Sequence, residues 1–141
     1  MLLQFPFALL EPVFYFCILH FTFFILMDID WLRKFCLSLP ATAEDIKWGN
    51  DLCFLVADKM FCVVGLEAPL KIAFKVSDEE FETLSTTEGF QPAPYMARAK
   101  WVLVNHPVAL NRKQWETYIR QSYNLVKARL TKKVRKEKGL E

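Results

Sequence analysis

The chain has 141 residues, with 18 Lys and Arg against 16 Asp and Glu, and a formal net charge of +2. This length supports one domain with a hydrophobic core. The hydrophobic content of 53% is raised by residues 1–26, which hold seven of the thirteen Phe and one charged residue, Glu11. Residues 27–141 have a net charge of +3 and the composition of an ordinary soluble domain.

The four cysteines are too far apart in sequence to form a Cys-x-x-Cys pair. They are Cys17, Cys36, Cys53 and Cys62, and three of them lie inside apolar runs. Cysteines in such runs behave as small buried hydrophobic residues. We therefore expect buried, reduced thiols in a cytoplasmic protein, ahead of disulfides or a metal site.

The first 26 residues form an apolar leader with three interpretations. As a membrane helix, the stretch from Val13 to Leu26 is short for a span. As a signal peptide, it lacks both a basic start and a small-residue cleavage site. The third interpretation is an upstream extension of the reading frame, with the protein starting at Met27. We favour the third; the second choice is a single-span anchor that holds the domain on the cytoplasmic side.

The domain begins with a predicted helix that Asp28 or Asp30 caps and that Pro40 ends. Its apolar positions follow helical spacing and are Leu32, Phe35, Cys36 and Leu39. Residues 41–45 are predicted to be a polar link. Residues 46–48 are then a candidate for a short strand, and Gly49 and Asn50 after it are predicted to form a turn.

Residues 52–57 and 60–64 are two apolar runs, which predicts a β-hairpin. They are joined at Asp58 and Lys59, a weak turn pair because Lys59 disfavours a positive φ. Residues 70–76 alternate, with Lys71 and Lys75 predicted to face outward from a strand that has one solvated face. The inward positions of that strand are Leu70, Ile72, Phe74 and Val76.

Two capping boxes predict the remaining helices. Ser77 with Glu80 starts a short helix that ends at Gly89, and Asn111 with Gln114 starts a long one. Between them, residues 101–104 form an apolar run rich in strand formers. The long helix carries one apolar stripe, Trp115, Ile119, Ser122, Tyr123, Val126 and Leu130, which fades near Val134. The pattern predicts a two-layer α+β domain, with an antiparallel sheet packed on helices.

With these residues placed, the chain resembles the MmcQ/YjbR family of small bacterial proteins over about residues 27–130, leaving an apolar leader at 1–26 and a basic tail at 131–141. The segments that carry the resemblance are Lys59-Met-Phe61, Leu70-Lys71, Pro94-Tyr95-Met96, Lys100-Trp101-Val102 and Ser122-Tyr123. The resemblance implies an α-β(3)-α-β(2)-α type of fold, similar to secretion-chaperone-like folds. It also implies similarity to double-wing DNA-binding domains, and it supplies no catalytic residues.

Nothing in the sequence has the pattern of a catalytic site, so we expect neither enzymatic activity nor a cofactor. His20 lies in the leader and His106 stands alone in a loop, where a histidine is usually structural or solvated. Cys53 and Cys62 are possible neighbours across the hairpin, but no histidine accompanies them as a zinc ligand. The four glycines are too scattered for a phosphate-binding loop.

The distribution of charge is more informative. Residues 111–138 hold ten Lys and Arg against two Glu, a net charge of +8, whereas residues 27–110 have a net charge of −4. A basic stripe of this kind engages phosphates with salt-sensitive affinity. The alternative, which is the more common one, is a solvated helix face with positive charge near its C-terminal end.

A second basic set belongs to the sheet, and Trp48 and Tyr95 are candidates to accompany it as part of a wing that contacts a nucleic-acid backbone. The alternative is that Lys71 and Lys75 keep an open sheet face soluble. The candidate nucleic-acid-binding residues from both sets are Lys59, Lys71, Lys75, Arg98, Lys100, Lys127, Lys132, Lys133 and Arg135.

Two functional hypotheses follow, and a third depends on the leader. The first is a DNA-binding module that makes mainly backbone contacts. The second is a protein-interaction or chaperone-like adaptor, self-association included, that uses the open sheet face or the loop from Pro92 to Tyr95. The third, a domain held at a membrane surface, requires that residues 1–26 are translated and retained.

Overall fold

The computed structural model describes residues 29–106 and 110–141; the leader and the predicted start at Met27 lie outside these ranges. Residues 29–38 are helical, and the helix ends before Pro40 as predicted. The other elements are β1 Thr42–Lys47, β2 Asp51–Val56, β3 Lys59–Gly65, β4 Lys71–Lys75, α2 Asp78–Leu84, β5 Phe90–Pro92, the 3-10 helix η2 Ala97–Ala99, β6 Trp101–Val104, α3 Arg112–Ala128 and α4 Lys132–Glu137. None of the described helices is both long and apolar enough to cross a membrane.

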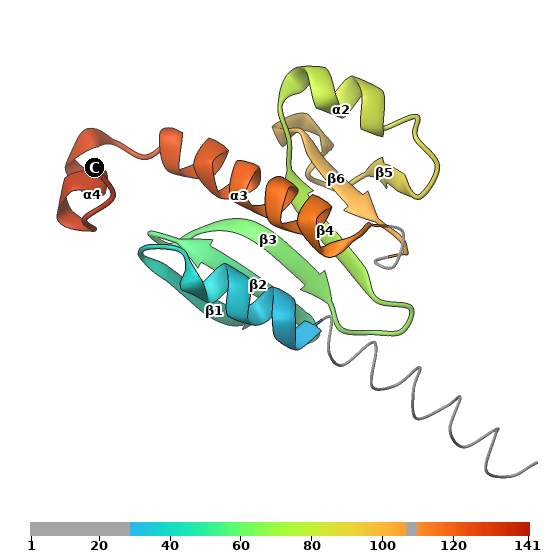
Figure 1. Ribbon diagram of the computed structural model, residues 1–141, viewed down its shortest axis with the longest axis horizontal. Coiled ribbons are helices and arrows are strands. Elements are labelled where there is room, and N and C mark those ends of the chain that lie inside the picture. The colour runs from blue at the N-terminus through green and yellow to red at the C-terminus, as the bar shows by residue number, and fades with distance from the viewer. Residues whose placement is uncertain (1–28, 107–109) are drawn as a thin grey trace, which may run out of the picture. The chain divides into compact units, whose positions relative to one another are not determined.

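The strands form one antiparallel sheet in the order β1-β2-β3-β4-β6-β5 (Figure 1), which confirms the predicted α+β class. Four strands precede α2 and two follow it, so the sheet has one strand more than the resemblance implies. The edge strand β1 includes most of residues 41–45, and the prediction of a polar link there was wrong. Every β1 residue pairs with β2 but none is buried, so its sequence lacks the apolar alternation of an inner strand.

The hairpin between β2 and β3 turns one residue earlier than predicted. Ala57 and Asp58 form the turn with φ of 45° and 66°, while Lys59 already belongs to β3. Positive φ at both central residues is typical of the two-residue turn whose twist matches that of paired strands. The positive φ that Lys59 disfavours is therefore adopted by Ala57 and Asp58.

A β-bulge interrupts β3 directly after the turn. Met60 and Cys62 pair with successive residues of β2, so Phe61 between them is an extra residue on this strand. The Phe61 ring meets the ring of Tyr123 on α3 edge-on, with 5.5 Å between their centroids. The bulge thus places Phe61 and Cys62 together in the core under α3.

Helix α3 covers one face of the sheet, lying across β3 and β4 (Figure 1). Its predicted capping box is present, since Asn111 and Gln114 exchange side-chain to backbone hydrogen bonds of 2.9 Å. The predicted apolar stripe is also confirmed, because its members are all buried. Phe74 of β4 packs against Trp115 and Tyr118 with ring centroids 5.9 and 5.2 Å apart. This face holds the main core.

The opposite face of the sheet is covered in part, so the prediction of a solvated face is confirmed at Lys71, which is exposed, and wrong at Lys75. Residues 93–100 fold over it, and Ala93, Met96 and Ala99 pack on a cluster that includes Ala73 and Trp101. Lys75, predicted to point into solvent, is only 5% exposed. From Ile72 to Lys75, the alternation in β4 therefore separates two covered faces.

Residues 131–141, predicted to be a basic tail, form helix α4 and a folded C-terminus. Thr131 caps the helix by accepting a hydrogen bond from the Val134 backbone N–H. The Arg135 guanidinium donates to the backbone carbonyl of Leu130, 3.0 Å away. Gly139 turns the chain with φ of 66°, and Leu140 after it is buried.

The three described cysteines are buried and free, as predicted. Cys53 and Cys62 do not face each other across the hairpin, because Cys53 pairs with Val63 and Cys62 pairs with Phe54, so the two thiols point to opposite faces of the sheet. The Cys62 thiol lies beside Cys36, and burial raises the pKa of Cys62. Burial, reinforced by the Asp51 carboxylate, raises the pKa of Cys53 to about 11.

The raised pKa of Cys53 predicts a loss of stability at high pH. The unfolded thiol ionises near the ordinary thiol pKa of 9.0, while the pKa of the folded thiol is about 11, so the free energy of unfolding falls as the pH rises between these values. Urea denaturation at about pH 8 and about pH 10 should show a decline that is about 1 kcal/mol smaller in Cys53→Ala than in the unmodified chain. Groups present in both proteins cancel in this difference. Equal declines would contradict the assignment.

Candidate nucleic-acid interface

The predicted basic residues of the sheet do not form one surface, because they lie at opposite ends of β4. Lys71 opens β4 and pairs with Gly65, whereas Lys75 closes it and pairs with Trp101. The first residue of β3, Lys59, lies at the Lys75 end, since β3 and β4 are antiparallel. Lys71 therefore lies at the far end of the sheet from the other candidates.

The exposed aromatic side chains are divided in the same way. Trp48 is 70% exposed in the turn between β1 and β2, where it shares a surface pocket with Lys71. Tyr95 is fully exposed in the segment that leads into β6, at the Lys75 end. The two rings thus lie at opposite ends of the sheet, and the structure does not bring them together as one wing.

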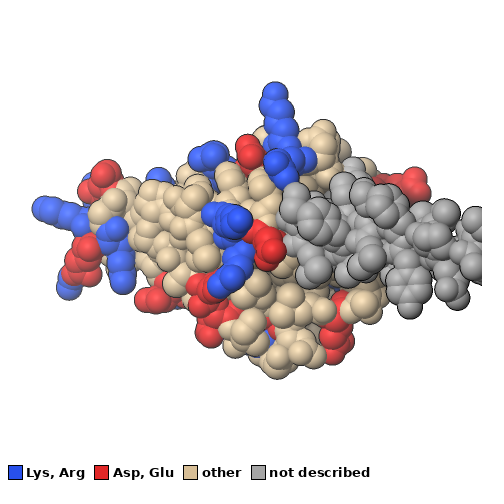
Figure 2. Space-filling model, turned by 60° about the horizontal axis from the view of Figure 1, so that its bottom comes forward, with Lys and Arg blue, Asp and Glu red and all other residues tan. Residues whose placement is uncertain are grey.

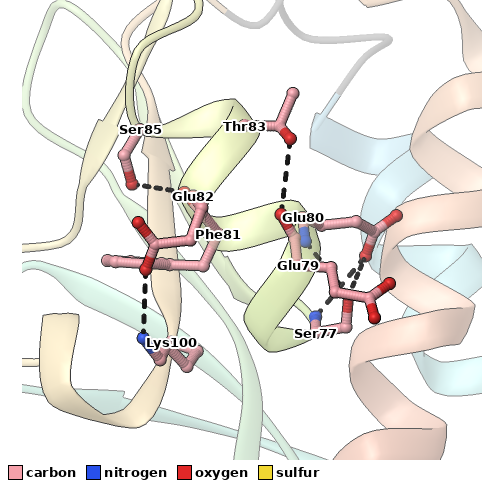
Figure 3. Close-up of polar contacts among 8 residues, drawn as sticks. All are labelled: Ser77, Glu79, Glu80, Phe81, Glu82, Thr83, Ser85 and Lys100. Carbon is pink, nitrogen blue, oxygen red and sulfur yellow. Dashed lines mark hydrogen bonds and ion pairs between the residues drawn. The ribbon is translucent and has the colours of Figure 1, made fainter.

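Lys100 and Arg98 belong to the segment before β6, and Lys100 is occupied by local contacts. Its ammonium lies 3.5 Å from the Glu82 carboxylate and 4.7 Å from the centroid of the Phe81 ring. Figure 3 shows Glu82 reaching from α2 toward Lys100, and the capping box of Ser77 at the start of the same helix. Arg98, in η2, is exposed. Of these two, Arg98 is the better placed to meet a ligand.

The candidates on α3 and α4 differ in how far their charges are available. The Lys127 ammonium lies over the Tyr123 ring, 5.7 Å from its centroid. Lys133 lies 4.0 Å from Glu137, an exposed ion pair of small energy, and Lys132 is exposed beside it. Arg135 contacts Glu141 at 3.5 Å, and its guanidinium also donates to the backbone carbonyls of Leu130 and Ala128.

The molecular surface reflects this division. In Figure 2, Lys and Arg side chains stand out at the end formed by α4, with Asp and Glu side chains among them. The exposed basic residues there are Lys132, Lys133, Lys136 and Lys138. The C-terminal part of the chain therefore presents four exposed lysines, with acidic side chains close by.

Ser122, buried on α3, joins the ends of β3 and β4. The last pair of the ladder between these strands is Cys62 with Phe74. At the next position the Ser122 hydroxyl donates to the Phe61 carbonyl, 2.5 Å away, and accepts from the Lys75 backbone N–H, 2.9 Å away. A side chain thus replaces the next rung of the sheet.

Beyond Ser122 the strand ends border a pocket, where the side chain of Lys75 lies. Its ammonium donates a hydrogen bond to the Ala99 carbonyl. Burial lowers the pKa of Lys75, and the nearby Arg129 guanidinium lowers it further. Arg129 is the C-cap of α3 and was not among the predicted site residues. Its place in the basic run was visible in the sequence, but its nearness to Lys59 and Lys75 arises only from the fold.

Comparison with known proteins agrees with this fold. The family model described as YjbR matches residues 37–125. The crystal structure of a Deinococcus radiodurans protein with domain DUF419 is similar, with 28% identity, a TM-score of 0.72, and coverage of 80% of this chain and 88% of that chain. A Pseudomonas syringae protein shares the fold, with 24% identity, a TM-score of 0.50, and coverage of 60% and 86% respectively.

A search among curated proteins gave no match. The family model, by contrast, spans well over half of the chain, and the residues that it matches are those of this chain that form the β-bulge, the segment over the second face and the Ser122 bridge. The chain belongs to the YjbR family.

Proposed function

We propose that this protein is a non-enzymatic DNA-binding module that contacts mainly the phosphate backbone. The observation that carries the proposal is the placement of basic residues near the end of α3. Lys59 at the hairpin and Arg129 at the end of α3 line one pocket. Lys132 and Lys133 follow Arg129 closely in sequence, at the start of α4. Such a surface binds phosphates without reading bases.

The test is fluorescence anisotropy of labelled duplex and single-stranded DNA, titrated with the full chain at several salt concentrations. We expect an affinity that falls steeply as salt rises. Replacing Lys59, Arg129, Lys132 and Lys133 with Gln should weaken binding by about tenfold or more and reduce the salt slope by roughly one unit for each lost contact. These substitutions are preferable to truncation after Leu130, which would also remove the buried Leu140.

Lys71 supplies the matched control, because it is an exposed lysine at the opposite end of the sheet. Lys71→Gln should leave DNA affinity nearly unchanged. An equal loss in this control would point to a general effect of charge instead of a defined surface. Absence of binding at low salt would reject DNA binding altogether.

A protein-interaction function is the second candidate, and of the two surfaces predicted for it the loop from Pro92 to Tyr95 remains available, since Tyr95 is fully exposed. The sheet face considered for it is covered in part by residues 93–100. Exposed apolar side chains instead gather around β1, where Ile46, Trp48 and Leu66 are 52%, 70% and 43% exposed. If this surface mediates self-association, the mass measured by light scattering should rise with protein concentration, and Trp48→Ser should abolish the rise.

A further inference from the structure

The pocket at the ends of β3 and β4 is small, contains a buried lysine and has an apolar wall. An exposed basic surface that binds the phosphate backbone of DNA requires none of these properties. The volume of the pocket is about 280 Å³, which is small for a ligand site and suits a compact molecule. Its lining residues come from β3, β4, the start of β6 and the segment before it, and α3 with the residues after it. They are Lys59, Lys75, Ala99, Trp101, Val126, Arg129 and Leu130.

The polar part of this pocket is entirely cationic. Its three charged residues are Lys59, Lys75 and Arg129, and no acidic residue lines it. Lys75 is 5% exposed and donates one hydrogen bond, to the Ala99 carbonyl. An ammonium group carries three hydrogens, so two remain for a ligand. A buried amine of this kind, held beside a guanidinium, is poorly compensated when the pocket holds no anion.

We propose that this pocket binds the phosphate group of a small organic phosphate. Lys75 and Arg129 bind the phosphate oxygens, with Lys59 at the hairpin end adding a third charge. The planar guanidinium of Arg129 suits paired contacts to phosphate oxygens, and several cations together favour a dianion over a single carboxylate. Trp101, Val126 and Leu130 provide an apolar wall for the organic part of the ligand.

The charges around Lys75 predict how binding depends on pH. Burial, Arg129 on α3 and Lys100 before β6 lower the pKa of Lys75, while Asp78 on α2 opposes them. A bound phosphate adds negative charge and raises that pKa, so binding takes up protons. Affinity should therefore fall as the pH rises through the pKa of Lys75 in the free protein.

The experiment uses phenyl phosphate as the probe, followed by NMR of backbone amides in the full chain. We expect saturable shifts at Lys75, Trp101 and Arg129, and weaker binding of inorganic phosphate, which lacks the apolar part. Lys75→Met and Arg129→Gln should each weaken phenyl phosphate binding by at least about tenfold. Lys71→Met, on the same strand but outside the pocket, should not change it.

Two results would overturn the proposal: no saturable shifts at the pocket, or unchanged binding in both Lys75→Met and Arg129→Gln. Arg129 is exposed, so its variant remains informative if Lys75→Met fails to fold. Because phenyl phosphate contains no nucleic acid, the outcome is independent of the DNA titration. Binding of the probe without DNA binding would leave this inference standing and reject the proposed function alone.

Discussion

Replacing Phe61 with alanine is expected to lower the free energy of unfolding by about 3–5 kcal/mol. Phe61 is the extra residue of the β3 bulge and has no exposed surface. Its ring packs edge-on against Tyr123, and its carbonyl accepts the hydrogen bond from Ser122. The substitution leaves a cavity between the sheet and α3 that the surrounding strands cannot close, because the bulge fixes the backbone there.

Urea denaturation of three variants tests this expectation. Phe61→Leu retains most of the apolar volume and should cost less than Phe61→Ala. Phe81→Ala removes a ring from α2 that is only partly buried, and should also cost less. A loss from Phe61→Ala no larger than that from Phe81→Ala would show that the bulge is not a centre of stability.

Replacing Ser122 with alanine is expected to cost about 2–4 kcal/mol, a large effect for the loss of one hydroxyl. The hydroxyl satisfies two buried backbone groups, the Phe61 carbonyl and the Lys75 N–H. Alanine leaves both without this partner, and each unsatisfied buried group costs about 1–3 kcal/mol. The apolar side chains of the α3 stripe are unchanged, so the loss of stability measures the contribution of the Ser122 hydroxyl at the junction of β3 and β4.

Thr117 provides the control on the same helix. Its hydroxyl donates to the Lys113 carbonyl within α3 at an exposed position. Thr117→Ala should change stability by no more than about 0.5 kcal/mol. Hydrogen exchange gives a second measurement, because Ser122→Ala should speed exchange of the Lys75 amide far more than Thr117→Ala does. Similar exchange in both variants would mean that another group replaces the hydroxyl.

The elements that the sequence predicted well are those whose signals are local. The capping boxes at Ser77 and Asn111 and the apolar stripe of α3 depend on residues within one helix, and all appear in the structure. The edge strand β1 was missed in part because neither of its faces is buried. The outward position of Lys75 was wrong because the segment that covers it lies some 20 residues later in the chain, at residues 93–100.

The candidate site was harder to predict than the fold, because it depends more on contacts between residues that are far apart in sequence. The excess of positive charge at the C-terminal part could be counted from the sequence, and the exposed lysines of α4 belong to it. The pocket could not be predicted from the sequence, because Lys59, Lys75 and Arg129 come from three distant segments. Helical spacing gives the direction of Arg129 around α3 but not the strand ends that it approaches. Conversely, Lys59 and Lys71 look equivalent in sequence, and only the strand register separates them.

The folded C-terminus changes what binding would cost in entropy. A disordered basic tail must lose conformational freedom when it settles on a polyanion, which offsets part of the attraction. The lysines of α4 are instead held on a helix that Thr131 caps, that Arg135 joins to the Ala128 carbonyl at the end of α3, and that Leu140 anchors. These charges are therefore preorganised. Loosening the anchor, for example by Leu140→Ser, should weaken any contact made by α4 even though no charge is removed.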